Sequence, residues 1–149
     1  MHAGTAARRA TAVTAAAATL AAAGCGDDGP TKAEFAKEAN AICKRHYVKI
    51  SAAARKLLAG GKLPTPREFG QLAMGTIIPE YSAQIRELRD VEPAETQSKA
   101  YEIWLNDSDS LRDRMQKNPA LAQQPRALSA VNGQADRLGL SRDCHIGPG

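Results

Sequence analysis

Residues 31–61, TKAEFAKEANAICKRHYVKISAAARKLLAGG, decide the fold of this chain. The stretch opens with Thr31 and Glu34, spaced as a capping box, in which each residue's side chain accepts from the other's backbone N–H. It closes with Gly60 and Gly61, and glycine commonly ends a helix. Between these ends, side chains of one face recur at steps of three and four, which predicts a helix of about seven turns: Phe35, Ala39, Ile42, His46, Ile50, Ala53 and Leu57.

A second helix is predicted to begin at a second capping box, residues 65–68. Pro66 takes the first helical position, where its missing N–H costs nothing. Gly75 and Pro79 lie inside the pattern and are expected to kink the helix, because proline removes a backbone hydrogen bond and clashes with the preceding turn. The apolar face of this helix is Phe69, Leu72, Thr76, Tyr81, Ile85 and Leu88.

Two further helical patterns follow the breaks at Pro93 and Pro119, the second interrupted once at Pro125. Gly139 is expected in the left-handed conformation that closes the last helix. No strand-length alternation of β-branched residues is present. The sequence therefore predicts an all-α, four-helix up-down bundle over residues 31–149. The apolar face of the third helix is Ala100, Trp104, Ser108, Leu111 and Met115, with Trp104 in the core. The apolar face of the fourth is Leu128, Val131, Ala135 and Leu138.

The N-terminus predicts export. Arg8 and Arg9 precede an apolar run, residues 10–23, which as a helix reaches roughly 21 Å, short of the roughly 30 Å hydrocarbon core. This pattern is typical of a signal peptide, here residues 1–24. The small residues before Cys25 resemble the lipobox of bacterial lipoproteins, although Ala22 stands where that motif prefers leucine. The resemblance implies acylation of Cys25, for instance with palmitate.

Cleavage before Cys25 would leave a chain that begins with the acylated cysteine. Residues 25–30 read as a flexible tether, so the protein is expected at the cell membrane, lipid-anchored on its extracytoplasmic face. The Sec and twin-arginine export routes both remain open. Arg8 and Arg9 are two of 20 basic residues, so the rest carries 18 basic against 16 acidic side chains. These charges are interspersed, which gives no support to nucleic-acid binding.

Two cysteines remain once Cys25 is assigned to lipid. Cys43 lies in the first helix and Cys144 just past the last, and in an antiparallel four-helix bundle these helices are neighbours. Thiols of exported domains are normally oxidised. The alternative is a zinc or copper site, because two thiolates with His46 and His145 are such a ligand set by type, although the usual close spacing is missing.

The stretches FAKEANAICKRHY and IPEYSAQIRELRDVEPAE, the isolated Trp104 and the terminal RLGLSRDC together resemble a family of small, uncharacterised actinobacterial lipoproteins. The family pattern is a helix bearing A-x-A-I-C and a C-terminal G-L-x-x-C; this chain has one more residue between Leu140 and Cys144. The resemblance covers nearly the whole chain after Cys25. It implies that Cys43 and Cys144 are disulfide partners, and it brings no activity.

No catalytic motif is recognised. G-x-S-x-G, the P-loop and H-E-x-x-H are missing from the sequence, and Asp107 and Asp109 do not continue into a calcium loop. The glutamates that could pair for catalysis are interpreted as exposed helical residues: Glu34, Glu38, Glu80, Glu87 and Glu102. We expect a non-enzymatic module without cofactor that binds a protein or an apolar ligand, which an exposed apolar groove near Pro79 would favour. The alternative is a metal- or redox-handling envelope protein that uses Cys43, His46, Cys144 and His145.

Overall fold

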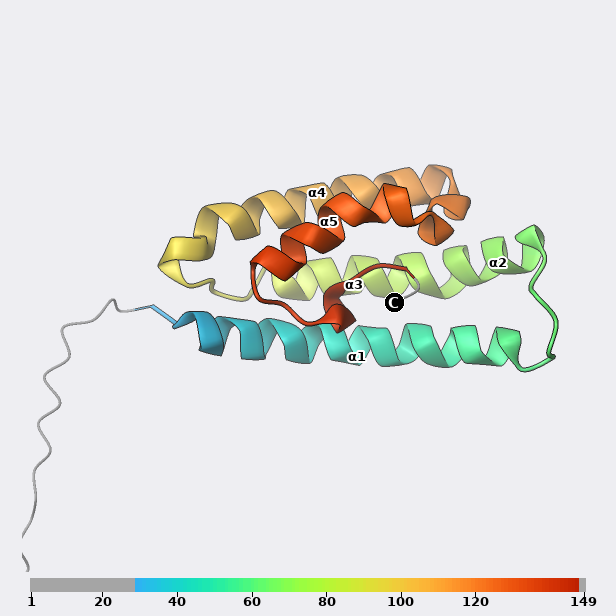
Figure 1. Ribbon diagram of the computed structural model, residues 1–149, viewed down its shortest axis with the longest axis horizontal. Coiled ribbons are helices and arrows are strands. Elements are labelled where there is room, and N and C mark those ends of the chain that lie inside the picture. Colours follow the sequence, from blue (N-terminus) through green and yellow to red (C-terminus); the bar gives the residue numbers. More distant parts are fainter. Residues whose placement is uncertain (1–28, 148–149) are drawn as a thin grey trace, which may run out of the picture.

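The computed structural model describes residues 29–147, which form the predicted helical bundle and contain no strand (Figure 1). Four legs run alternately up and down, and the second leg is continuous through a π-helical turn. The predicted signal peptide, Cys25 and most of the predicted tether lie outside the described residues. No helix within residues 29–147 is long and apolar enough to cross a membrane. The legs are α1 (Lys32–Leu58), α2 (Pro66–Leu72) joined by the π turn (Ala73–Ile77) to α3 (Ile78–Leu88), α4 (Ser98–Lys117) and α5 (Pro125–Arg137).

Both predicted capping boxes are confirmed. The Thr31 hydroxyl oxygen accepts from the Glu34 N–H at 3.2 Å, while the Glu34 carboxylate accepts from the Thr31 N–H at 2.9 Å. Thr65 and Glu68 repeat the arrangement before α2, with Pro66 at the first helical position. These local bonds satisfy the amide donors that a helix leaves free at its start, so both starts could be predicted from sequence.

Where the sequence predicts a kink at Gly75 and Pro79, the structure has a π turn. The Ile78 N–H donates to the Ala73 carbonyl, five residues back. A proline inside a regular α-helix clashes with the carbonyl four residues before it, which for Pro79 is that of Gly75. The wider π turn relieves such crowding, and the chain enters α3 without leaving the helical conformation.

The last leg ends as expected. Gly139 has φ +77°, and the Leu140 N–H donates to the Ala135 carbonyl at 3.0 Å. A short 3-10 turn, η4 (Arg142–Cys144), follows and carries Cys144 to α1, where it forms the disulfide with Cys43. The Cα atoms of the two cysteines lie 4.8 Å apart, and both residues are buried.

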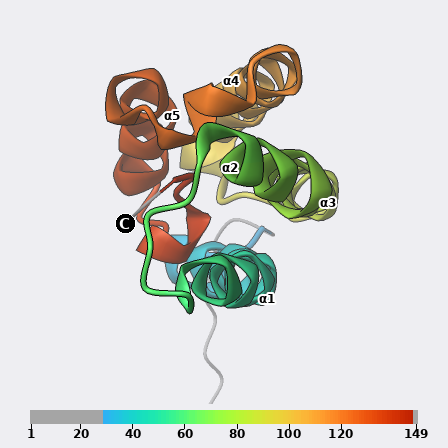
Figure 2. The same cartoon turned by 90° about the vertical axis from the view of Figure 1, so that its right-hand side faces the viewer.

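The packing order explains how the bundle closes. α1 packs against α3, α3 against α4, and α4 against α5. The sequence predicted α1 and the last helix as direct neighbours. In the structure η4 lies between α1 and α5, and α1 contacts η4 instead (Figure 2). The tail after α5 is therefore a wall of the bundle and not a loose end.

Aromatic residues fill the core at the end where α1 begins. Phe35 meets Tyr101 edge-to-face with ring centroids 4.8 Å apart, and Tyr101 stacks on Trp104 at 5.7 Å. The Tyr101 hydroxyl donates to the Leu88 carbonyl at 2.6 Å. Trp104 is 1% exposed, which confirms its predicted place in the core.

Candidate functional site

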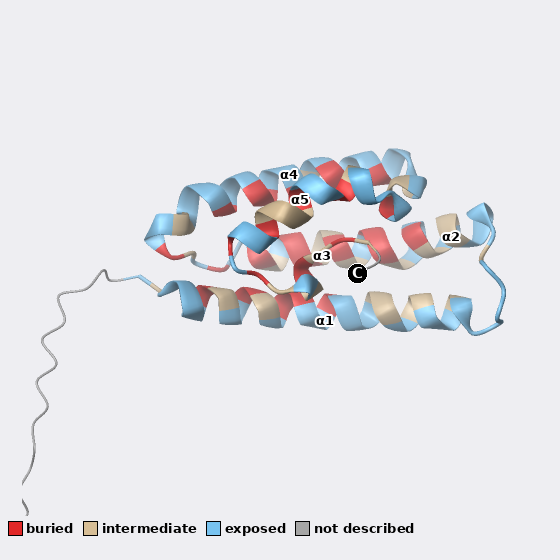
Figure 3. Cartoon of the chain, viewed as in Figure 1, coloured by how far each residue is buried: buried red, intermediate tan, exposed pale blue. Residues whose placement is uncertain are grey.

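The apolar stripe of α1 is buried over only half of its length. Its fully buried residues end at His46, whereas Ile50, Ala53 and Leu57 are half-buried (Figure 3). α2, which faces this part of α1 across the loop, contains no fully buried residue. The core is therefore open at the end of the bundle where α1 ends, and apolar side chains remain there without full cover.

A cavity of about 450 Å³ occupies this opening. Its size lies in the range of about 300–1,000 Å³ that is typical of small-molecule sites. From Tyr47 to Leu58 it follows α1 for about 16 Å, at the helical rise of 1.5 Å per residue. The lining residues are mostly apolar: Tyr47, Ile50, Ser51, Ala54, Leu57, Leu58, Pro64, Phe69, Leu72, Ile77, Tyr81, Gln84, Ala122, Gln123, Asp143, His145, Ile146 and Gly147.

The cavity has a polar and an apolar end. Tyr47 lies one turn beyond Cys43 on α1, and Asp143 directly precedes Cys144, so the disulfide brings these two lining residues to the same end. His145 follows Cys144 and lies there too. Towards the end of α1 the wall consists of aliphatic and aromatic side chains, chiefly those of Leu57, Phe69 and Leu72, with Ala54, Leu58 and Pro64.

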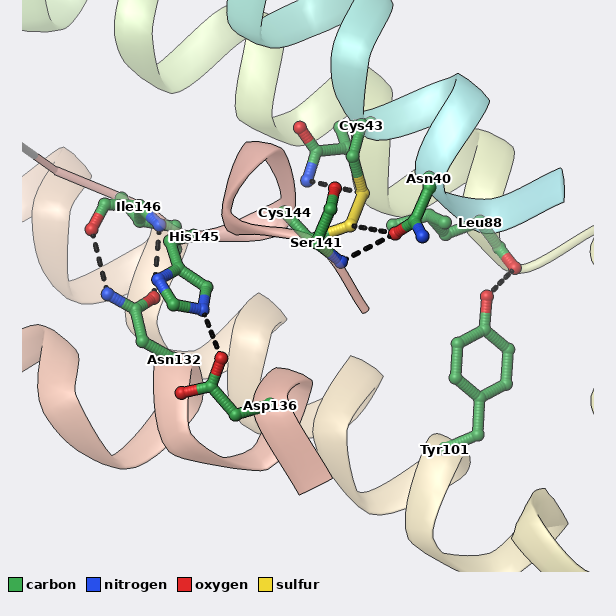
Figure 4. Close-up of a disulfide and its surroundings, with 11 residues drawn as sticks. Asn40, Cys43, Leu88, Tyr101, Asn132, Asp136, Ser141, Cys144, His145 and Ile146 are labelled. Atoms are coloured by element: carbon green, nitrogen blue, oxygen red, sulfur yellow. Dashed lines mark hydrogen bonds and ion pairs between the residues drawn. A yellow bond between two sulfur atoms is a disulfide. The ribbon is translucent and has the colours of Figure 1, made fainter. Parts of the chain in front are cut away.

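The C-terminal tail is fixed as a wall by side-chain hydrogen bonds (Figure 4). The Asn132 amide donates to the Ile146 carbonyl and accepts from the Ile146 N–H, both at 3.0 Å. His145 Nε2 lies 2.9 Å from Asp136 Oδ1, and the Ser141 N–H donates to Asn40 Oδ1 at 2.7 Å. The tail is thus joined to α5 as well as to α1. No local sequence signal indicates these contacts, because each links residues that only the fold brings together.

A charged cluster borders the polar end of the cavity on α1. His46 is 2% exposed, and its Nδ1 lies 2.7 Å from Glu80 Oε2 while its Nε2 lies 3.1 Å from Glu87 Oε1. Both ring nitrogens of His46 therefore face carboxylate oxygens of α3. Lys49 bonds Glu80 at 3.1 Å and Arg45 bonds Glu87 at 2.5 Å. The two carboxylates of α3 thus hold His46 and two cations of α1.

The carboxylates of this cluster have altered acidity. Burial raises the pKa of Glu80, but hydrogen bonds from His46 and Lys49 outweigh it and hold the pKa below its ordinary value. For Glu87 the Arg45 hydrogen bond is the main cause of a lowered pKa; burial opposes it and His46 adds to it. Both groups therefore stay ionised at neutral pH, which suits an ion-pair cluster rather than a proton-transfer site.

The sequence interpretation of Glu80 as an exposed residue is wrong, since its side chain is only 24% exposed, and Glu87 is likewise half-buried. Both sit on the His46 side of α3. Their spacing of seven residues, two helical turns on one face, was the available signal. The other candidates, Glu34, Glu38 and Glu102, are exposed as expected, and Glu34 serves the capping box.

The four residues of the alternative metal or redox site are divided among different contacts. Cys43 and Cys144 are bonded to each other, His46 lies between Glu80 and Glu87, and His145 bonds Asp136. The contact with Asp136 ties His145 to α5. Within residues 29–147 no group of three or more histidine, cysteine, aspartate or glutamate side chains is arranged to hold a metal ion.

Comparison with known protein families, with curated proteins and with solved structures finds no match for this chain.

Proposed function

We propose that this chain is a lipid-anchored, extracytoplasmic binding protein, without enzymatic activity, that holds a small apolar molecule in the cavity between α1, α2 and the C-terminal tail. The observation that carries the proposal is the cavity itself: apolar lining, small-molecule size, and a position beside the π turn before Pro79. Transfer of apolar surface from water into such a site is favourable by about 25 cal/mol per Å².

The walls of the cavity also support binding of a small molecule more than docking of a helix. The tail is joined to α1 by the disulfide and to α5 by the Asn132 amide. A site built on such fixed elements is largely preformed, which lowers the entropic cost of binding.

A plug in the cavity tests binding. Ala54 lines the cavity, whereas Ala52 is exposed on the same helix outside it. Ala54→Trp places an indole in the space, and Ala52→Trp is the matched control. Titration with the neutral probe N-phenylnaphthylamine should give saturable fluorescence in the parent and in Ala52→Trp, with affinity at least about tenfold weaker in Ala54→Trp. Equal binding by the two variants, or no saturable binding by the parent, contradicts the proposal.

The membrane anchor is tested at Cys25. Cys25→Ser should release the protein from membranes or leave the precursor uncut, because acylation needs the thiol. Stable anchoring takes about two acyl chains, since one chain alone holds only marginally. A Cys25→Ser chain that fractionates and migrates like the parent would show the assignment to be wrong.

A further inference from the structure

The chemistry at the polar end of the cavity selects among apolar ligands. Asp143 supplies the one carboxylate of the lining and His145 its one imidazole, and His145 Nε2 already faces the Asp136 carboxylate. Within residues 29–147, no lysine or arginine lines the cavity. Among the described residues, no hydrogen bond or ion pair engages the carboxylate of Asp143, which is half-buried. The cavity therefore offers one carboxylate without a cationic partner.

This charge pattern disfavours an anionic ligand. A carboxylate or phosphate drawn into the cavity loses water, meets no cation in the lining and lies near Asp143. The nearby cations lie outside the lining: Arg45 and Lys49 bond Glu87 and Glu80. Lys44 beside Cys43 and Arg142 beside Asp143 are exposed and do not line the cavity either. Arg55 and Lys56, in the last turn of α1, are exposed and also lie outside the lining.

A cation meets the opposite situation. It would form a charge-assisted contact with Asp143, which is stronger than a neutral hydrogen bond. Tyr47, at the same end, adds an aromatic ring, and aromatic side chains attract ammonium groups. From this end, about 16 Å of largely apolar wall leads along α1 to Leu58, which suits one flexible hydrocarbon chain.

We propose that the cavity binds a cationic amphiphile, with an amine or ammonium group beside Asp143 and Tyr47 and an apolar chain lying towards Leu57 and Leu72. This inference rests on the proposed function, since it names the class of ligand for the same cavity. Asp143 specifies a positively charged head group, which the apolar walls alone do not.

The test uses three probes with the same dodecyl chain, each below its micelle-forming concentration and at physiological ionic strength: dodecyltrimethylammonium, dodecanoate and the neutral dodecyl maltoside. Each probe displaces N-phenylnaphthylamine from the full-length protein. The cation should bind at least about tenfold more tightly than the anion. Asp143→Asn should bring the two within about threefold and leave the neutral probe unchanged, because it removes the charge and keeps the shape.

Asp90→Asn is the matched control, since it removes the same charge from an exposed residue in the loop after α3, outside the cavity. It should leave the preference for the cation intact. The inference is overturned if Asp143→Asn keeps the parent's preference for the cation, or if the anion binds the parent as tightly as the cation does. In either case, binding of the neutral probe still supports the proposed function. Failure of every probe to displace N-phenylnaphthylamine, or equal displacement from Ala54→Trp, overturns both.

Discussion

Trp104 shows how far one residue can be interpreted from sequence. It is the only tryptophan, its spacing to Leu111 and Met115 placed it on an apolar stripe, and it is buried against Tyr101. His46 was placed on a buried face by the same periodicity. The periodicity could not predict the partners of His46, because Glu80 and Glu87 belong to another helix. Their distance from His46 depends on the rotation and register of α3 against α1.

Truncation of Trp104 tests its role in the core. Trp104→Ala should lower the free energy of unfolding by about 3–5 kcal/mol, because it leaves a large cavity among packed side chains. Ile103→Ala, at a 47% exposed neighbour, should change it by less than about 0.5 kcal/mol. Denaturant unfolding measures both. An unchanged midpoint for Trp104→Ala, with emission typical of tryptophan in water for the parent, would contradict the assignment.

The charged cluster predicts how stability depends on acid. The pKa values of Glu80 and Glu87 lie below their ordinary value of 4.5 in the folded protein. A carboxyl with a lowered folded pKa stabilises the fold above pH 4.5, and the contribution is lost as pH falls through the folded pKa. The double variant Glu80→Gln with Glu87→Gln should therefore be less stable than the parent at neutral pH, and the difference should shrink below pH 4.5. Thermal unfolding over pH 3–7, roughly the range in which carboxyls titrate, measures this difference in stability. Glu102→Gln, at an exposed residue, is the control. A difference between parent and double variant that persists unchanged at the acid end would refute the role of the two carboxylates.

At the scale of elements, helix boundaries were predictable because the signals are local. Two capping boxes, the Pro66 start and the Gly139 end each depend on a few adjacent residues. The open half of α1 was not predictable in this way. Its periodicity identifies one face through Leu57, but how much of that face is covered depends on how closely α2 packs on it and which way the tail runs. The candidate site arises because α2 and the tail flank the second half of α1 without covering it fully.

The end of α5 provides a test at this scale. Gly139 has φ +77°, a conformation that costs a residue with a side chain about 1–2 kcal/mol. Gly139→Ala should therefore destabilise the fold by about that amount. Gly70→Ala, inside α2 where an added Cβ meets nothing within 4 Å, should instead stabilise it by about 0.5–1 kcal/mol. Opposite signs in denaturant unfolding are expected; two changes of the same sign would contradict the assignment of Gly139 as the helix-ending residue.

For the whole molecule, the disulfide joins the bundle and the site. It links positions 101 residues apart, so it constrains most of the folded chain, and it attaches η4 to α1 beside the polar end of the cavity. Ligand binding in the cavity needs this wall in place, since Asp143 and His145 flank Cys144. The tail has other attachments, through Asn40 and Asn132, so loss of the bridge should loosen the wall more than remove it.

Removal of the bridge therefore affects stability and binding together. Cys43→Ala with Cys144→Ala should lower the free energy of unfolding by about 2–4 kcal/mol, because a loop of about 100 residues is no longer closed in the unfolded chain. Affinity for N-phenylnaphthylamine should fall as well, because part of its binding energy would then be spent on ordering the tail. Thiol titration of the unfolded Cys25→Ser protein, without reductant, checks the premise and should find no free thiol. Two reactive thiols would disprove the bridge, whereas full affinity in a destabilised double variant would show that the bridge stabilises the bundle without shaping the cavity.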